Sequence, residues 1–193
     1  MVNGSRRVGA AVVLLGALVS CGTGSGTAGP AAPEPSARTA DARSASPARL
    51  TEAPVPRCRT AGLSAAVGRM DPGAGQRNFP VVLTNVSSRT CTLYGYPGAA
   101  FVDAAGGQLG RDPKRTPGDP VTVTLAPGTS AWAGLRYSSP GVSGARTATP
   151  SALLVTPPDE RDPLKVPWRA GAVPVSGNAS SVFLTTLEPG TGP

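Results

Sequence analysis

The chain has 193 residues, room for one ordinary domain with appendages, and its 25 Gly and 22 Pro indicate that part of it is unstructured. Aromatic residues make up only 4% of the chain and charged residues 15%, so any core must rely on Val, Leu and Ala. The formal net charge is +7, but the arginines are scattered and lack the clustering and interleaved aromatics of a nucleic-acid interface, so we expect no nucleic-acid partner.

Residues 1–20 are predicted to be a signal peptide. Arg6 and Arg7 supply the positive start, and the uncharged run that follows, residues 8–19, is too short to span a bilayer core, which needs roughly 20 helical residues. Nothing in the pattern separates the general secretory route from the twin-arginine route. No later stretch is long and apolar enough to predict a transmembrane helix.

The signal segment ends in a sequence that resembles the bacterial lipobox, Leu18-Val19-Ser20-Cys21. In a lipobox a small residue precedes the cut, and the cysteine thiol receives a diacylglycerol, whose two chains give lasting membrane attachment. We therefore predict lipidation of Cys21 and a position on the outer face of the cell membrane. The alternative is an ordinary secretory signal, with Cys21 a free thiol and the protein secreted.

The count of cysteines is odd, which in an exported protein requires an explanation. If Cys21 carries lipid, Cys58 and Cys91 remain as one pair in an oxidising compartment, where a disulfide persists. Two buried free thiols or a metal site are the alternatives. The chain has no His and no further Cys that would complete a metal site, so we expect no metal and no cofactor.

Residues 21–56 are predicted to be a lipid-anchored cysteine followed by a disordered tether. From residue 22 to residue 56, 27 of 35 residues are Ala, Gly, Pro, Ser or Thr, and none is aromatic. Such a segment cannot bury enough apolar surface to offset its conformational entropy. As a coil it would span about 30 to 35 Å.

Residues 57–193 have the pattern of a small all-β domain: short alternating apolar runs, separated by Gly, Pro, Asn and Asp. In chain order we expect turns at 71–73, 85–89 and 126–129, a hairpin around 104–107, a polar loop over 110–120, and strands near 63–67, 79–83, 91–93, 99–103, 121–125, 131–137, 153–155, 164–168, 173–175 and 182–187. Pro80 suggests that the second of these strands lies at an edge. Eight to ten short strands favour an antiparallel β-sandwich, immunoglobulin-like or jelly-roll-like, over a barrel.

The run Thr84-Asn85, then the block Cys91-Thr92-Leu93-Tyr94-Gly95-Tyr96-Pro97-Gly98, resembles a family of secreted actinobacterial proteins, domain of unknown function 4232. The segments 106–110 and 123–128 continue the resemblance, which covers roughly residues 57 to 188. It implies a β-sandwich, a disulfide between Cys58 and Cys91, and export, commonly as a lipoprotein. Family members often carry a second cysteine pair near residues 146–149 and 176–177, which this chain lacks. No activity or ligand follows from the resemblance.

Enzyme chemistry is not expected in this domain. Without His there is no imidazole base to activate a nucleophile. A Ser-Lys dyad would need Lys114 or Lys165, both in polar or alternating contexts. The carboxylates lie beside Pro or Gly in presumed turns, where they keep ordinary pKa values and make poor general acids.

The candidate ligand-binding residues are aromatic: Tyr96, Trp132 and Trp168, with Tyr94 and Tyr137 as further possibilities. On an exposed face such rings could stack on sugars; the alternative is that they fill the core.

A basic loop could meet anionic wall polymers, unless it is simply solvated. It contains Arg111, Lys114 and Arg115.

The function that these features favour is a membrane-anchored lipoprotein, expected to be a monomer, that presents its sandwich as a non-enzymatic binding module at the cell envelope. Its partner would be an envelope polymer or a protein. Second comes a structural or accessory envelope protein that acts through protein partners, which would present a flat face or an unpaired edge strand. A hydrolase is the third hypothesis and would require a deep polar pocket.

Overall fold

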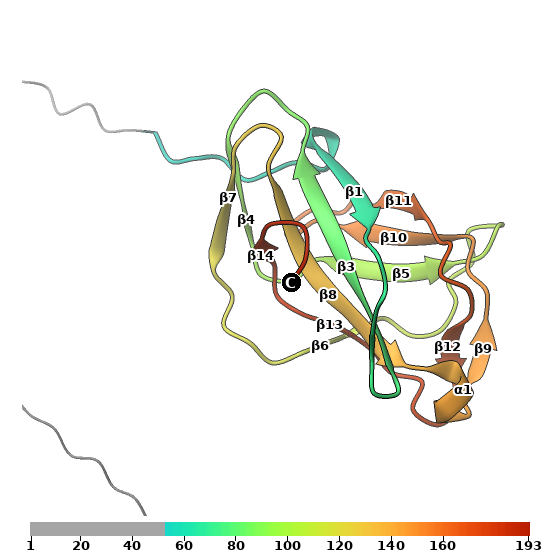
Figure 1. The fold of residues 1–193 in the computed structure, drawn as a ribbon. Helices are drawn as coiled ribbons and strands as arrows, with labels where there is room; N and C mark the ends of the chain where they lie inside the picture. The colour runs from blue at the N-terminus through green and yellow to red at the C-terminus, as the bar shows by residue number, and fades with distance from the viewer. Residues whose placement is uncertain (1–52) are drawn as a thin grey trace, which may run out of the picture. The chain divides into compact units, whose positions relative to one another are not determined.

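The computed structural model describes residues 53–193, where nearly all regular structure is β (Figure 1). The predicted signal peptide, Cys21 and the tether up to residue 52 lie outside these residues. Within them, one sheet contains seven strands: β1 (Leu63–Val67), β2 (Asp71–Gly73), β3 (Gln76–Asn85), β6 (Lys114–Arg115), β8 (Ser130–Ser138), β13 (Val182–Leu184) and β14 (Glu188–Pro189). The order is β1-β3-β8-β13-β6, while β2 pairs with β3 and β14 with β8. All these pairs are antiparallel except β13 with β6.

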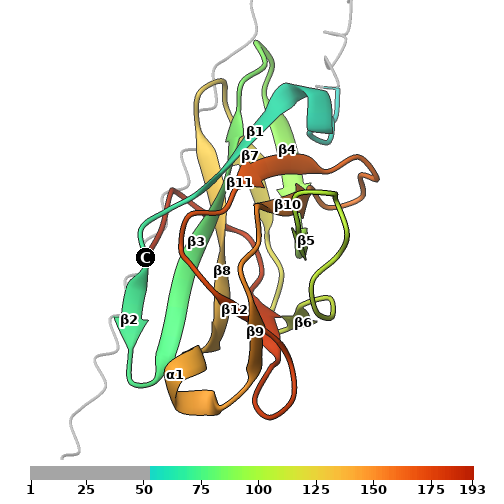
Figure 2. The same ribbon diagram turned by 90° about the vertical axis from the view of Figure 1, so that its right-hand side faces the viewer.

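Three smaller antiparallel sheets form the second layer of the sandwich, and in Figure 2 strands β5, β10 and β11 lie to one side of β3 and β8. The first small sheet contains β5 (Gly98–Val102), β10 (Ala152–Thr156) and β11 (Leu164–Pro167); the second contains β4 (Cys91–Tyr94) and β7 (Thr122–Leu125); the third contains β9 (Arg146–Ala148) and β12 (Val173–Ser176). Two single turns complete the elements, a 3-10 turn η1 (Thr60–Gly62) and a helical turn α1 (Pro140–Ser143).

The core forms because alternate residues of each strand face the space between the layers. On β8 the inward residues are fully buried; they are Ala131, Ala133, Leu135 and Tyr137. Four aromatic rings meet at the centre, with Phe79 and Phe101 each 5.0 Å or less from the ring of Trp168. The expected all-β sandwich is therefore confirmed.

The disulfide joins Cys58 and Cys91, both buried, with their Cα atoms 4.9 Å apart. It ties the first residues of the domain to β4, where the Cys58 amide also donates to the Thr92 carbonyl at 2.9 Å. Of the three possibilities that the sequence left for Cys58 and Cys91, namely a disulfide, two free thiols or a metal site, the structure shows the disulfide.

The turn after β3 is organised by Asn85, whose side chain is completely buried. Its Nδ2 donates to the carbonyls of Arg89 at 2.8 Å and Leu125 at 2.9 Å. Its Oδ1 accepts from the amide of Ser87 at 3.0 Å and the Ser87 hydroxyl at 2.7 Å. One amide side chain thus satisfies backbone groups from two separate turns, which explains why the chain has Asn here.

Some local predictions were wrong. Residues 71–73 form strand β2 instead of a turn, because they pair with residues 76–78 across a turn that contains Gly75 at φ 71°. Strand β3 lies inside the sheet, between β1 and β8, although it contains Pro80. The Pro80 carbonyl accepts from the Gly68 amide at 2.8 Å, so the side on which proline lacks a donor faces the break between β1 and β2. The residues from 53 to 193 contain fourteen short strands, more than the eight to ten expected.

Candidate functional site

Trp168 lies in the core and is 6% exposed, so it cannot serve as the stacking platform considered from the sequence. Its ring packs edge-on against Phe79 and Phe101, and its Nε1 donates to the Gly171 carbonyl at 2.8 Å. A buried indole with its donor satisfied has a structural role. Tyr137 is likewise buried in this cluster.

Trp132 lies on the opposite, outer face of the large sheet, where it is half-buried. In the strand register it is paired with Val82 of β3 on one side and Glu188 of β14 on the other. The structure therefore separates the two tryptophans, one inside the sandwich and one outside. It does not bring either of them to the basic loop.

Tyr96 does meet the basic loop. The guanidinium of Arg115 lies over the Tyr96 ring, 5.2 Å from its centroid, and the Tyr96 hydroxyl donates to the Thr116 carbonyl at 2.7 Å. Both contacts hold the loop against the end of the block of residues 91–98, called the signature block from here on, because Tyr96 belongs to the turn that follows β4. Tyr96 thus positions the loop, and its ring face is already occupied by a cation.

The basic loop borders a hollow of about 350 Å³ on one side. Arg111 and Lys114 line it, together with Asp112 and a segment that runs from the end of β12 to the start of β13, namely Val175, Ser176, Gly177, Ser180, Ser181 and Val182. We call it the serine hollow. Cationic and hydroxyl-bearing side chains donate hydrogen bonds to oxyanions. Because this hollow is lined by two cations and three serines, it suits a negatively charged group.

A second hollow of about 390 Å³ lies on the other side of the loop, over β5 and β10. Its walls are mainly apolar and include Pro97, Ala99, Ala100, Pro113, Leu154, Pro163 and Leu184. Arg115, Asp112 and Thr156 add polar groups. We call it the proline hollow. It shares Asp112 with the serine hollow, so the two are adjacent, and the Asp112 carboxylate accepts a hydrogen bond from Gln108 at 2.7 Å.

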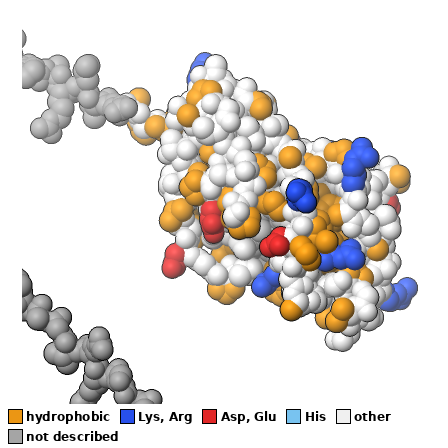
Figure 3. All heavy atoms as spheres, in the orientation of Figure 1, with side chains coloured by type: hydrophobic (Ala, Val, Ile, Leu, Met, Phe, Trp, Pro, Cys, Tyr) orange, Lys and Arg blue, Asp and Glu red, His pale blue; other side chains and the backbone are white. Residues whose placement is uncertain are grey.

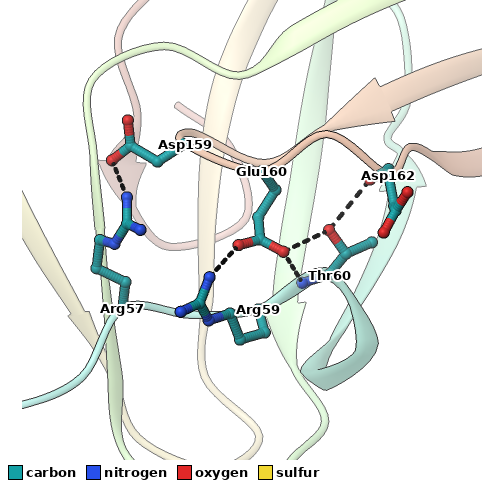
Figure 4. A network of polar contacts seen from close by, with 6 residues as sticks. All are labelled: Arg57, Arg59, Thr60, Asp159, Glu160 and Asp162. Carbon is teal, nitrogen blue, oxygen red and sulfur yellow. Dashed lines mark hydrogen bonds and ion pairs between the residues drawn. The ribbon is translucent and has the colours of Figure 1, made fainter.

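The carboxylates of Asp159 and Glu160 form a clasp at the start of the domain (Figure 4). Arg57 pairs with Asp159 at 2.8 Å, and Arg59 pairs with Glu160 at 3.0 Å. Glu160 also accepts hydrogen bonds from the amide and the hydroxyl of Thr60, each at 3.1 Å. The hydrogen bond from the Thr60 amide, followed by the interaction with Arg59, lowers the pKa of Glu160. The clasp fastens the first residues of the domain to the loop between β10 and β11.

Tyr137 is the second group with a shifted pKa, and the cause is again structural. Burial raises the pKa of its hydroxyl, while the nearby Arg77 guanidinium opposes the rise. Arg77 lies outside hydrogen-bond geometry, and the Tyr137 oxygen has no hydrogen-bond partner among the described residues. The group lies in the core and lines neither hollow.

A comparison with known protein families matches residues 58–188 to Domain of unknown function (DUF4232). The chain belongs to the DUF4232 family. The match spans the described domain from the first cysteine of the disulfide to β14. No curated protein matches the chain in a sequence comparison.

The signature block of this DUF4232 domain leads to the proline hollow. It runs along β4 and turns at Gly95, whose φ of 95° is suited to glycine, and ends with Pro97 and Gly98 in the hollow's wall. The end of the signature block therefore contacts the basic loop and forms part of the wall of the candidate site. The family description names no function.

The sequence indicated the basic loop but missed the residues around it. Ser176, Ser180 and Ser181 come from one distant segment and Pro163 from another, and only the folded sheets bring these segments to the loop. No local pattern marks them. The parallel pairing of β6 with β13 is the contact that places Lys114 beside Phe183.

Proposed function

We propose that the chain is an exported, membrane-anchored lipoprotein whose DUF4232 sandwich is a non-enzymatic binding module at the cell envelope. The observation that carries this proposal is the exposed loop with Arg111, Lys114 and Arg115, flanked on both sides by hollows of ligand size. None of the three takes part in an ion pair among residues 53–193. Their charge is therefore available to a ligand.

The surroundings of the hollows favour binding over catalysis. Catalytic acids and bases commonly have shifted pKa values, and neither Tyr137 nor Glu160 lines either hollow. The hollows instead combine cations, hydroxyl groups and apolar walls, a combination that recognises a ligand without a reactive group.

The anchor in this proposal rests on the sequence around Cys21 and on the tether that follows. The described part of the chain agrees with a separate domain after the tether, since the family match begins at Cys58. Among residues 53–193, no helix has the length and apolar character needed to cross a bilayer. A lipid at Cys21 and a coil of about 30 to 35 Å would hold the domain close to the membrane and within reach of envelope polymers.

The domain's charge supports an anionic partner. Residues 53–193 contain thirteen Lys and Arg against eight Asp and Glu, a net charge of +5, whereas residues 22–52 contain three of each. The positive charge of the mature chain thus belongs to the folded domain. In the view of Figure 3, the Lys and Arg side chains lie mostly on the half of the face away from the N-terminal segment of the domain.

A second candidate function is supported by the edge strand β7. Among the described strands it pairs with β4 alone. Val121, which precedes β7, is 55% exposed, and Tyr94 of β4, opposite the first residue of β7, is 54% exposed. An unpaired edge can add a strand from a partner protein, as an accessory envelope protein would require.

Co-sedimentation with isolated cell-wall material tests the proposal. The protein, purified from membranes in detergent, should sediment with the walls and be released as the salt concentration rises, because exposed charges are screened by salt. Protein that stays in the supernatant at low salt would contradict a wall-binding module. Cross-linking in cells to a single protein, in place of wall binding, would support the accessory function.

A further inference from the structure

We propose that the serine hollow and the proline hollow form one continuous binding site for an anionic glycan, with its charged group against Arg111 and Lys114 and a sugar ring in the proline hollow. This inference rests on the proposed binding function and names its ligand class. It commits to a polymer that carries both hydroxyl-bearing rings and phosphate or carboxylate groups.

The first argument is the positive charge, which extends beyond the loop. The parallel register places Lys114 beside Phe183 of β13, and Phe183 is paired in turn with Arg136 of β8. The Arg136 guanidinium lies 5.4 Å from the centroid of the Phe183 ring. An exposed cation on β8 therefore adds its field to that of Arg111 and Lys114, and a charged polymer would be attracted to this corner of the domain.

The second argument is the set of hydroxyl groups that line the same hollow as Arg111 and Lys114. Ser176 and Ser181 make no side-chain hydrogen bond within the described domain, so their hydroxyls remain available to a ligand. Ser180 lines the same hollow and donates to the Gly177 carbonyl at 2.9 Å. A phosphate or carboxylate bound between Arg111 and these serines would gain charge-assisted hydrogen bonds on one side and neutral ones on the other.

The third argument is the chemistry of the proline hollow. Pro97 and Pro113 present C–H surface suited to the apolar face of a sugar ring, and Thr156 offers a hydroxyl at the edge. The Arg115 side chain lines the same hollow from its position over Tyr96. Each hollow is at the small end of the range for ligand pockets, so each accommodates one unit of a polymer and not a large compact ligand.

Asp112, between the two hollows, argues for a glycan and against a simple polyanion. A carboxylate at this point repels a second anionic group. The same carboxylate would accept hydrogen bonds from sugar hydroxyls, just as it accepts one from the side-chain amide of Gln108. The order of groups across the site is therefore the Arg111 and Lys114 cations, the Asp112 carboxylate, and a mainly apolar wall that also includes Arg115. This order matches a charged group followed by a hydroxyl-bearing ring.

Binding of the detergent-purified full chain to four defined polymers tests this inference: polygalacturonate for a carboxylate glycan, phosphomannan for a phosphate glycan, inorganic polyphosphate for a pure polyanion, and dextran for a neutral glycan. We expect binding to polygalacturonate or phosphomannan, both of which carry sugar rings, and the stronger of the two identifies the anionic group. Polyphosphate and dextran should bind weakly or not at all. Equal binding to polyphosphate, or binding to dextran, would overturn the glycan assignment.

Two double variants each remove two positive charges, one pair inside the serine hollow and the other outside both hollows. R111Q/K114Q should weaken binding about tenfold or more, because it removes both charge-assisted contacts. R69Q/K165Q removes one Arg and one Lys that are also exposed but do not line either hollow, and should change affinity by less than about twofold. D112N should weaken binding to the glycan and not to polyphosphate.

Equal losses in R111Q/K114Q and R69Q/K165Q would show that only the net charge matters, and would overturn the site. Unfolding midpoints of the variants check that they fold, and the salt dependence of the unaltered chain provides a measurement independent of substitution. If the protein sediments with cell-wall material but binds none of the four polymers, this inference fails while the proposed function stands. If neither walls nor polymers bind, both fail.

Discussion

The substitution Asn85→Ala is predicted to be among the most destabilising single changes at a polar residue of the domain. It removes four hydrogen bonds at once, and the side chain is completely buried. The Leu125 carbonyl lies in the buried part of this network, so leaving it without its donor costs about 1 to 3 kcal/mol. The Ser87 amide and the Arg89 carbonyl lie nearer to solvent, where water replaces part of each bond, at about 1 kcal/mol each.

The expected loss for Asn85→Ala is therefore about 4 kcal/mol of unfolding free energy, measured by urea titration of the oxidised protein. Ser87→Ala is the control, because it removes the hydroxyl that donates to Asn85 but leaves the buried Leu125 carbonyl with its donor. The other contacts of this hydroxyl, with the Arg89 carbonyl and amide, are exposed, so the loss should be about 1 kcal/mol. A loss below about 1.5 kcal/mol for Asn85→Ala would refute the reasoning, since the buried carbonyl would then have to be satisfied in another way.

Three further predictions concern the clasp, the tryptophans and the missing cysteine pair. Folding lowers the pKa of Glu160, so its carboxylate stabilises the fold above its unfolded pKa near 4.5, and this stability is lost as the pH falls through and below that value. Glu160→Gln should therefore reduce the fall in melting temperature between about pH 5 and pH 3, and an unchanged slope would count against the clasp. Trp168→Ala should cost about 3 to 5 kcal/mol in urea titrations and Trp132→Ala only about 1 to 2, whereas equal costs would contradict their placement. R146C/S176C, at paired positions of β9 and β12, should form a disulfide worth about 2 to 4 kcal/mol, and thiols that stay free in non-reducing thiol titration would show that the register differs.

The alternation of apolar residues predicted the longest strands well. On β8 the inward positions of Ala131, Ala133 and Leu135 follow directly from it, and the same alternation puts Trp132 on the other face. Because positions 132 and 137 fall on opposite faces by this alternation, the sequence alone could have assigned Tyr137 to the core and kept only Trp132 as a surface aromatic. Period-two patterns define faces reliably wherever one side of a sheet is buried.

The elements that the sequence missed depend on partners far along the chain. Lys114 and Arg115 look like loop residues and become a strand only because β13 lies beside them. Pro80 indicated an edge strand, yet the gap between β1 and β2 leaves room for a proline inside the sheet. Local propensity contains no information on such pairings.

The candidate site was predictable only in part, and for the same reason. The cluster of Arg111, Lys114 and Arg115 is visible in the sequence, because it depends on residues close together in the chain. The serines and prolines around it are not, because four segments meet there only after folding. The clasp between Arg57 and Asp159 joins residues about a hundred positions apart and has no sequence signal.

The measurement that tests the account most directly is the intact mass of the protein from its native membrane fraction, before and after reduction. The account predicts a chain that begins at Cys21, carries the mass of a diacylglycerol, and gains the mass of two hydrogens when the Cys58–Cys91 disulfide is reduced. An unlipidated chain recovered from the medium would contradict the membrane anchor, and the domain would then have to act as a freely diffusing binder.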